Sequence, residues 1–414
     1  MPTVPRARLA LALLVLLNVL NYADRQLVSA LGVPIERDLG LNHAQLGLLY
    51  GYAFILVHTL AAVYLGTLAD RFDRGRIIAA GLFVWSAATA LSGFARSLVS
   101  LGAARVLVGV GEAALGPAAL ALLADLYPPQ ERARVAGWFQ GGIPVGVILA
   151  ALVAAALEPA YGWRVCFLVL GGVGIAASFA MLALRDTPRS TELGGQRTAE
   201  LLRELVATLR RSPALLWTVL GGTLLVYEHA ARGLLIVWLQ TERGFDLRTA
   251  TLRAGTMSLV AGLLGAVLGG ALADRVERRS RGGRLRLLAW GQLVFGPAAW
   301  AMLRLDPHAN AVAFHVTWFV AVAGTMMAYG PVLAEVQDLA PARIRSTALA
   351  FFLMVSNLLG AGLGPLVTGA IGDRRSLTDG FLVSVVVGTA SLPLLLVAAR
   401  ARRREGSARL SPAE

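Results

Sequence analysis

Two stretches of the chain repeat one pattern, AAVYLGTLADRFDRGR at residues 61–76 and GLLGAVLGGALADR at residues 262–275. Both are apolar runs with small residues that end in Gly-x-Leu-Ala-Asp-Arg. The copies lie about 200 residues apart, and a pattern that recurs at this distance indicates a chain of two related halves. In a membrane protein, two parallel halves are typical of transporters that rock about a binding site. The sequence therefore predicts a duplicated membrane protein.

The composition places the chain in a membrane. Hydrophobic residues make up 57% of it and charged residues only 15%, and the mean hydropathy is +0.66. A soluble chain carries about 25% charged residues. Stretches such as 9–23, 45–69 and 379–399 are long enough to cross the roughly 30 Å hydrocarbon core of a bilayer. We interpret residues 9–31 as the first span, because they do not show the short apolar core and cleavage site of a signal peptide.

We predict an all-α integral membrane protein with twelve transmembrane helices in two pseudo-symmetric six-helix halves. The N-terminal half covers residues 1–184 and the C-terminal half residues 214–400. A polar linker at 185–213, which has the pattern of a surface helix in its second part, and a tail at 401–414 are placed in the cytoplasm. The predicted spans are 9–31, 45–69, 77–95, 99–124, 133–157, 164–184, 214–240, 252–273, 285–303, 310–335, 344–370 and 380–399.

Arginine sets the predicted orientation, since all 38 basic residues are arginines. The termini and the loops after even-numbered spans hold 26 of them, whereas the opposite loops hold nine. The positive-inside rule therefore puts both termini in the cytoplasm. The net charge of +13 lies on loops that flank the membrane and meet anionic lipid, so it does not indicate a nucleic-acid partner. An arginine-only basic set is typical of a high-GC bacterial genome, which predicts an inner-membrane location.

The sequence does not point to an enzyme. It has no P-loop, so ATP is not expected as the energy source. The Gly-x-Gly in GVGEA at 109–113 falls inside an apolar span rather than after a strand, which argues against a dinucleotide site. The single cysteine, Cys166, excludes an intrachain disulfide and a multi-cysteine metal site, and we interpret it as a small core residue. We predict no cofactor and no metal.

The repeated motif predicts a cytoplasmic gate. Gly66 and Gly270 are expected to let two helices approach closely near the cytoplasmic face. Asp70 and Asp274 stand where an apolar helix ends and basic residues begin, so each carboxylate can cap a neighbouring helix or pair with an arginine. The alternative is a plain orientation signal at a short loop. The predicted gating motif consists of Gly66, Asp70, Arg71, Arg74, Gly270, Asp274 and Arg275.

Few charges fall inside the predicted spans. A charge at the bilayer centre costs roughly 2.5–3.5 kcal/mol, so such residues normally face the bundle interior and are paired. They are the candidates for substrate and ion contacts. The set is Asp24 and Arg25 in the first span, Arg105 and Glu112 in the fourth, and Glu228, His229 and Arg232 in the seventh.

Helix geometry predicts how the first two pairs meet. Arg105 and Glu112 are seven residues apart, so they share one face about 10 Å apart along the axis. The first span runs outward and the fourth inward, which brings both pairs to similar depth. We predict that Glu112 and Arg25 face each other across a cavity. Asp24 lies about 100° around the helix from Arg25 and is expected to point to Arg105.

These residues suggest two roles. Burial disfavours the charge of Glu112 while a nearby arginine favours it, so moving the arginine away lets the carboxylate take a proton. We therefore predict Glu112 and Asp24 as proton-coupling residues. Arg25 and Arg105 are predicted to bind substrate, because guanidinium groups suit carboxylate and phosphate. The alternative is a static buried ion pair that holds the helices together.

The seventh span adds a second group. Glu228 and Arg232 are four residues apart and can pair on one face, either to hold the helix or to contact substrate. His229 and His58 could titrate or be structural, and both readings stay open. The further residues predicted to line the substrate site are Tyr52, Tyr329 and Asn357.

Several stretches resemble a known family. GTLADRFDRGR at 66–76 is similar to the loop motif of the major facilitator superfamily. The resemblance to its Spinster-like branch rests on NYADRQ at 21–26, RVLVGVGEAALGPAALALLADLYPPQERAR at 105–134, GGIPVGVILA at 141–150 and NLLGAGLGPLVTGAIGD at 357–373. The resemblance implies a monomer that transports by alternating access, with lipid-like or amphipathic anionic substrates and proton coupling. It also places Asp24, Arg25 and Glu112 on the functional charges of the branch.

Two transport hypotheses follow. The first is a proton-coupled carrier of a lysophospholipid or another amphipathic anion, with protons, membrane lipid and the substrate as its partners. The second is a proton symporter of a water-soluble organic anion such as a sugar acid or a carboxylate, and drug efflux is a third substrate option. A membrane sensor or scramblase that transports nothing against a gradient is the alternative from another class.

Overall fold

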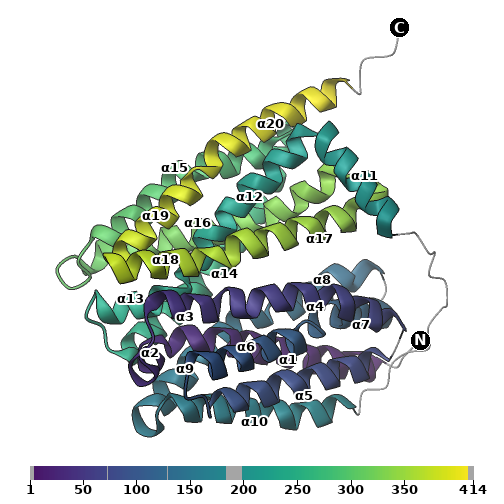
Figure 1. Cartoon of the computed structure of the whole chain (residues 1–414). Helices are drawn as coiled ribbons and strands as arrows, with labels where there is room; N and C mark the ends of the chain where they lie inside the picture. The colour runs from purple at the N-terminus through teal and green to yellow at the C-terminus, as the bar shows by residue number, and fades with distance from the viewer. Residues whose placement is uncertain (1–3, 72, 128, 183–197, 409–414) are drawn as a thin grey trace. The chain divides into compact units, whose positions relative to one another are not determined.

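The computed structural model describes residues 4–71, 73–127, 129–182 and 198–408, and every regular element in these ranges is a helix (Figure 1). Ten of the helical segments are long and apolar enough to cross a membrane by length and composition. The predicted all-α membrane fold is confirmed. The two predicted spans that are not among these ten are the fourth and the ninth. The fourth is divided into two shorter helices, and the ninth, α15, carries Gln292 and Pro297 among its apolar residues.

The first six predicted spans correspond to the helices from α1 to α10, with α2 lying between the first two spans. Their bounds are α1 Val4–Ala30, α2 Gly32–Leu39, α3 His43–Tyr50, α4 Tyr52–Arg71, α5 Arg74–Ser92, α6 Leu98–Glu112, α7 Leu115–Leu126, α8 Pro129–Gln140, α9 Gly142–Tyr161 and α10 Trp163–Leu182.

The linker holds α11, Thr198–Arg211, which confirms the predicted surface helix. Its leucines Leu201, Leu205 and Leu209 pack on the core of the helices that follow. Those helices are α12 Pro213–Ala231, the 3₁₀ turn η1 Arg232–Leu234, α13 Leu235–Thr241, α14 Leu247–Arg279, α15 Gly283–Arg304, α16 Ala311–Leu339, η2 Ala342–Ile344, α17 Arg345–Val355, the π-helical η3 Ser356–Ala361, α18 Leu363–Arg374, α19 Leu377–Thr389 and α20 Ser391–Ala408.

Prolines explain three irregularities in the spans. A proline removes the backbone hydrogen bond to the carbonyl four residues earlier and clashes with it. Pro117 thus accounts for the break at 113–114 between α6 and α7, and Pro144 for the end of α8 at Gln140. Pro365 stands four residues after Ala361, the last residue of η3. The first of these breaks places Glu112 at the end of a helix.

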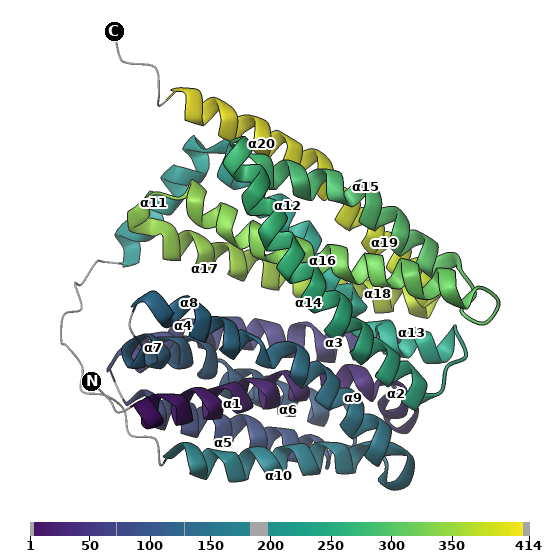
Figure 2. The ribbon, with the colours of Figure 1, turned by 180° about the vertical axis from the view of Figure 1, so that it is seen from behind.

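The helices group into two compact units. One comprises Met1–Thr191 with Gly233–Leu259, and the other Glu192–Arg232 with Val260–Glu414. In the first unit α9 and α10 pack along α1 and α5, as Figure 2 shows from behind. Cys166 of α10 is buried there, as predicted. The boundary between the units passes through the break in the seventh span, so α13 packs with α1 and α2.

The second unit has its own apolar core. The core lies between α12, α15, α16, α17 and α20 and includes Leu215, Leu288, Val336, Phe352 and Leu395, each at most 3% exposed. Helix α12 packs along α20, and α15 along both α16 and α20. This packing fixes the rotation of α12 and α16, which carry the second group of candidate site residues.

Candidate functional site

Four charged side chains form two ion pairs in the first unit. Arg25 Nε of α1 lies 2.6 Å from Glu112 Oε2 of α6. Arg105 Nη1 of α6 lies 3.2 Å from Asp24 Oδ1 of α1. Both predicted pairings are confirmed, although Arg25 and Glu112 are in direct contact. The neighbouring residues Asp24 and Arg25 point to different partners because successive side chains diverge by about 100° around a helix.

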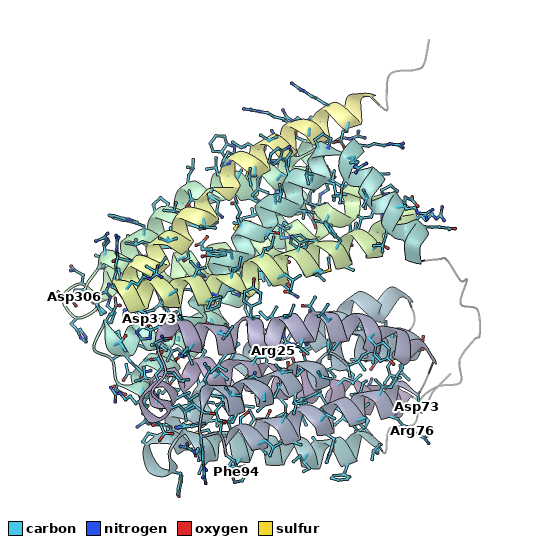
Figure 3. The ribbon with its side chains drawn as sticks, in the orientation of Figure 1. Arg25, Asp73, Arg76, Phe94, Asp306 and Asp373 are labelled. Carbon is cyan, nitrogen blue, oxygen red and sulfur yellow. The ribbon has the colours of Figure 1, made fainter. Side chains whose placement is uncertain are left out.

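The two pairs differ in their access to solvent. Asp24 and Arg105 are fully packed, at 1% and 2% exposed, and Thr89 of α5 donates its hydroxyl hydrogen to Asp24 Oδ2 at 2.6 Å. The side chain of Arg25 is 25% exposed, whereas that of Glu112 is buried. Arg25 is thus the one member of the group whose charge reaches open space. Arg25 lies five residues before the end of α1, and Figure 3 shows it far from Asp73 and Arg76 at one end of the unit.

Aromatic side chains surround the Arg25 guanidinium. Its central carbon lies 4.7 Å from the ring centroid of Phe54 and 5.1 Å from that of Tyr22. His58 stacks on Phe54, and its Nε2 lies 3.4 Å from Arg25 Nη2. A cation held against aromatic faces keeps an attractive contact when its carboxylate partner leaves. Arg25 is therefore held in place independently of Glu112.

Only one of the two carboxylate oxygens of Glu112 has a hydrogen-bond partner among the residues that the structure describes. Its Oε2 accepts from Arg25, while its Oε1 is buried and has no hydrogen-bond partner among the residues that the structure describes. A buried acceptor without a partner is unfavourable, and each one calls for an explanation. Protonation of Oε1 would explain why a buried carboxylate oxygen is left without a donor.

The seventh span brings its charges together in the second unit. Arg232 Nη2 lies 3.4 Å from Glu228 Oε1 and 3.4 Å from the carbonyl oxygen of Ala321 in α16. The predicted pairing of Glu228 and Arg232 is confirmed. Glu228 packs closely against Gly388 of α19, whereas the Arg232 side chain is 18% exposed. The glutamate holds the helix in the bundle, and the arginine offers a partly free charge.

The remaining predicted lining residues fall in different places. Tyr329 of α16 is half exposed and lies with His229 along one apolar pocket of the second unit. Tyr52 is the first residue of α4 and is half-buried. The residue of α4 that contacts Arg25 is Phe54, two positions later. Asn357 is half-buried in the π-helical segment η3. In the part of the chain that the structure describes, His, Cys, Asp and Glu side chains do not gather in groups that could hold a metal ion.

The predicted gating motif is described only in part. Gly66, Asp70 and Arg71 belong to α4, and the description of that segment does not extend to their side chains. Arg74 pairs with Asp125 at the end of α7. In the second copy Asp274 accepts from Arg284 at 2.8 Å, and Arg284 also pairs with Asp338 at the end of α16. Arg275 is exposed.

Within the second unit, a different pair of glycines makes the close helix contact expected of Gly270. A side chain at Gly270 would meet no heavy atom within 4 Å, so no helix of the second unit packs closely on this glycine. The close approach to α16 is made by Gly265 and Gly269, five residues and one residue before Gly270, and Cβ atoms at these two positions would overlap Ala323 and Met327. The rotation of α14 turns Gly270 away from α16, which the repeat alone could not reveal.

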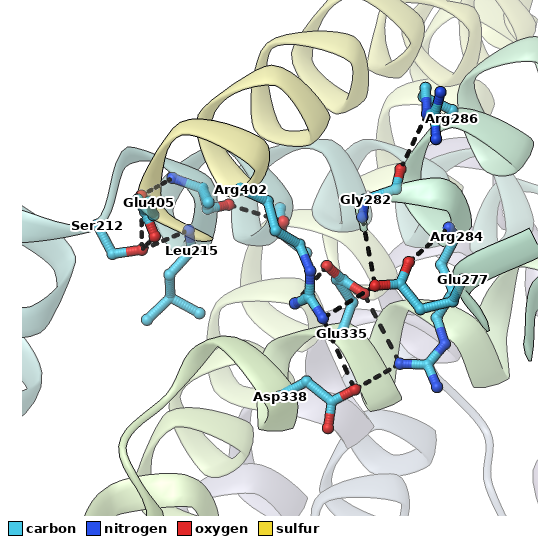
Figure 4. A network of polar contacts seen from close by, with 12 residues as sticks. Ser212, Leu215, Glu277, Gly282, Arg284, Arg286, Glu335, Asp338, Arg402 and Glu405 are labelled. Atoms are coloured by element: carbon cyan, nitrogen blue, oxygen red, sulfur yellow. Dashed lines mark hydrogen bonds and ion pairs between the residues drawn. The ribbon is translucent and has the colours of Figure 1, made fainter. Parts of the chain in front are cut away.

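The acidic side chains beside this motif bind the last helix. Glu335 of α16 is fully buried, and its Oε1 lies 2.7 Å from Arg402 Nη1 of α20. Glu277 of α14 accepts from the same guanidinium at 3.2 Å, and Asp338 lies at its edge (Figure 4). The pairing of Glu335 with Arg402 could not be predicted from the sequence, because the two residues lie on helices far apart in the chain. Together these contacts tie α20 to α14 and α16.

The model of the Major Facilitator Superfamily matches residues 14–365. The chain belongs to the Major Facilitator Superfamily. An MFS-type efflux pump of Mycolicibacterium smegmatis is 30% identical over 398 residues, which cover 95% of this chain and 90% of that protein. Protein spinster homolog 3 of Danio rerio is 28% identical over 397 residues, which cover 90% of this chain and 78% of that protein.

The fold has a solved counterpart in this superfamily. The crystal structure of a bacterial homolog of the human lysosomal transporter Spinster, in an inward-facing and unoccupied conformation, matches with a TM-score of 0.87 over 100% of both chains at 23% identity. The twelve-helix fold and the Spinster-like resemblance are therefore confirmed. The protein is a multi-pass membrane transporter of a superfamily that is not enzymatic.

The break in the seventh span of this transporter is held by two contacts in the first unit. Ser29 of α1 donates its hydroxyl hydrogen to the carbonyl oxygen of Gly233 at 2.5 Å. A Cβ atom on Gly233 would overlap the ring of Tyr50, whose hydroxyl in turn lies 3.3 Å from Gln26 Nε2. Glycine at 233 is thus required by the approach of Tyr50. No sequence pattern marks Ser29 and Tyr50 as neighbours of Gly233, because this glycine lies far from them in the chain.

Gly233→Ala is expected to lower the free energy of unfolding by about 1–3 kcal/mol, because Tyr50 or the backbone at 233 must shift to make room. The measurement is denaturant unfolding of the purified protein. Gly172→Ala is the matched control, since a Cβ on this exposed glycine of α10 meets nothing within 4 Å. Equal stability of the two variants would contradict this prediction, because it would show that the position of the Tyr50 ring does not require a glycine at 233.

Proposed function

We propose that this protein is a proton-coupled secondary transporter that moves an amphipathic anion of the lysophospholipid class by alternating access. The observation that carries the proposal is the pair of Arg25 and Glu112, in which a partly exposed cation is bound to a buried carboxylate with one unused oxygen. We further propose that it acts as a monomer in a bacterial inner membrane, with both termini in the cytoplasm, as the arginine distribution predicts.

Competition for Arg25 couples substrate to protons. An anionic substrate that binds the guanidinium displaces Glu112 as its partner. A buried carboxylate without a cation is strongly unfavourable, so Glu112 takes up a proton as it is displaced. Release of the substrate lets the ion pair form again and expels the proton. One proton thus accompanies each bound anion through this site.

The second pair supports this exchange. Asp24 and Arg105 are buried deeper than Arg25 and are satisfied by each other and by Thr89. Because they cross from α1 to α6, they keep the two helices in register while Arg25 changes partner. In this mechanism Asp24 positions the site and does not carry the proton itself.

The surroundings of Arg25 favour a substrate with apolar as well as anionic parts. Besides its polar partners Glu112 and His58, the guanidinium stands against the aromatic rings of Phe54 and Tyr22. A phosphate or carboxylate head can bind the guanidinium edge while a hydrocarbon portion lies on the rings. The Spinster-like resemblance implies the same substrate class.

Drug efflux is the second candidate. The relative from Mycolicibacterium smegmatis is named an MFS-type efflux pump and is 30% identical to this chain. Efflux of a cationic drug would favour a free carboxylate in the site over a free arginine. The partly exposed member of the pair is Arg25, whereas Glu112 is buried, so we place an anionic substrate first.

Tracer uptake by proteoliposomes under an imposed proton gradient tests the proposal. Labelled lysophosphatidylglycerol is expected to accumulate against its gradient, and unlabelled lysophosphatidylglycerol to compete with it, while galactarate and ethidium do not. Accumulation of galactarate alone would replace the substrate class with water-soluble organic anions, and transport of ethidium alone would make the protein a drug exporter. Equal movement of lipid in both directions without any gradient would indicate a scramblase.

A further inference from the structure

Two arginines of the second unit meet at one uncharged hydroxyl group. Arg286 Nη2 of α15 donates to Ser280 Oγ at 2.7 Å, and Arg403 Nη2 of α20 donates to the same oxygen at 3.1 Å. Ser280 lies in the turn between α14 and α15. Two positive charges that converge on a neutral oxygen repel each other, and an anion beside them removes that repulsion.

The acidic side chains near this turn are bound to other arginines, Arg284 and Arg402. Among the residues that the structure describes, Arg286 has no carboxylate partner, and its second acceptor is the carbonyl oxygen of Gly282 at 3.4 Å (Figure 4). Arg286 is half-buried, so its side chain is held in place. It is thus a fixed positive charge that the described chain does not neutralise.

The backbone of the turn brings the two arginines together. Gly282 has a φ of +74°, and a Cβ atom on it would lie 2.9 Å from the carbonyl oxygen of Ala399 in α20. The turn therefore lies directly against the backbone of α20. Arg403 follows Ala399 by about one helical turn, which places it beside Ser280. Packing of the turn on α20 builds this arrangement.

An exposed apolar stripe of α15 begins next to Arg286. Trp290, Leu293 and Pro297 follow it by four, seven and eleven residues, a spacing that puts them on the same face of the helix. The side chains of Trp290 and Leu293 are 55% and 53% exposed. In a membrane-spanning helix such a face meets acyl chains, and tryptophan is enriched at the level of the headgroups. The arginines therefore stand at the headgroup end of a lipid-facing surface.

We propose that Arg286, Arg403 and Ser280 bind the phosphate of an anionic phospholipid of the phosphatidylglycerol class, whose acyl chains lie along α15. Guanidinium groups bind phosphate through charge-assisted hydrogen bonds that are often bidentate. Ser280 Oγ already accepts from both arginines, so its own hydrogen can turn to a phosphate oxygen. Basic sites between membrane helices are suited to anionic headgroups.

The charge of the site selects among lipids. Phosphatidylcholine and phosphatidylethanolamine carry the same phosphate with a cation close to it, and the two arginines repel that cation. Phosphatidylglycerol has a net negative charge and hydroxyl groups in its place. The bound lipid ties the α14–α15 turn to α20. This site belongs to the second unit, whereas the proposed substrate contact at Arg25 belongs to the first.

Native mass spectrometry of the full chain, purified in a neutral detergent and titrated with lipid, tests this proposal. Phosphatidylglycerol is expected to bind about tenfold more tightly than phosphatidylcholine with the same acyl chains, as hydrogen bonds to charged groups predict. Inorganic phosphate at the same concentration is expected not to displace it, because inorganic phosphate has no acyl chains to contact α15.

Two variants locate the site. Arg286→Gln and Arg403→Gln are each expected to weaken the binding of phosphatidylglycerol about tenfold and to leave that of phosphatidylcholine unchanged. Arg211→Gln is the matched control, because Arg211 is exposed at the end of α11 and its loss removes the same charge from the same unit. Arg403 is exposed, so its variant decides the question even where Arg286→Gln does not fold.

Three outcomes would overturn the proposal. If both variants bind phosphatidylglycerol as tightly as Arg211→Gln, the arginines are not a lipid site. If the wild type binds the two lipids equally, the surface does not select an anionic headgroup. Displacement of the lipid by inorganic phosphate at an equal concentration would show that the site holds a free anion. The transport proposal stands in each case, because it depends on Arg25 and Glu112.

Discussion

Glu112→Gln is expected to reduce substrate-driven proton movement to the level of liposomes without protein, while the variant still folds and binds substrate. Glutamine keeps the size of the side chain and an oxygen that can accept from Arg25 Nε, the contact that the carboxylate makes at 2.6 Å. It has no carboxylate to exchange a proton. Arg25 still contacts the rings of Phe54 and Tyr22 and is partly exposed, so its charge is not left buried without a favourable contact.

The measurement compares proton movement and tracer exchange in the same proteoliposomes. Exchange of labelled lysophosphatidylglycerol at equal concentrations on both sides is expected to persist in Glu112→Gln, because exchange needs no net proton transfer. The control is Glu158→Gln, which removes a carboxylate near the end of α9 and is expected to keep full coupling. If Glu112→Gln retains proton movement, Glu112 is a packing residue and the coupling site lies elsewhere.

Arg105→Met is expected to cost about 3–5 kcal/mol of stability, the largest effect of any single change discussed for this chain. It removes the cation beside Asp24, whose carboxylate is 1% exposed and would keep only the hydroxyl of Thr89. The double variant Asp24→Asn/Arg105→Met removes the stranded charge together with its partner. It is expected to recover most of the loss, because replacing both members of a buried pair costs far less than removing one.

Denaturant unfolding of the two single variants and the double variant gives the coupling energy directly. Arg343→Met is the matched control, because this arginine faces Glu200 and Glu204 at 3.7 Å with half of its side chain exposed. Such surface pairs contribute about 0–1 kcal/mol. If Arg105→Met loses no more stability than the control, Asp24 and Arg105 are not a structural pair and Asp24 is free to take part in proton transfer.

Helix geometry explains why the ion pairs could be predicted. The seven-residue spacing of Arg105 and Glu112 and the adjacency of Asp24 and Arg25 fix which side chains share a face, whatever the rest of the fold does. The spans were predictable for a similar reason, since the bilayer demands long apolar helices. Proline positions could also have located the breaks, as Pro117 does for α6.

The rotation of each helix could not be predicted in this way. Phe54 and Thr89 come to the charges from α4 and α5, and nothing in their own spans marks them as neighbours of Arg25 or Asp24. The same limit applies to the second copy of the repeated motif, where packing turns Gly265 and Gly269, and not Gly270, toward α16. Apolar neighbours of a site carry no pattern of their own, so they emerge only from the packed structure.

Proton movement in proteoliposomes that hold a pH-sensitive dye tests the central claim most directly. Lysophosphatidylglycerol added outside vesicles with the wild-type protein is expected to acidify the interior, and the acidification to disappear with Glu112→Gln and persist with Glu158→Gln. Uptake of labelled lysophosphatidylglycerol by the wild type without any acidification would contradict the claim. The protein would then be a uniporter in which the pair of Arg25 and Glu112 serves packing or gating alone.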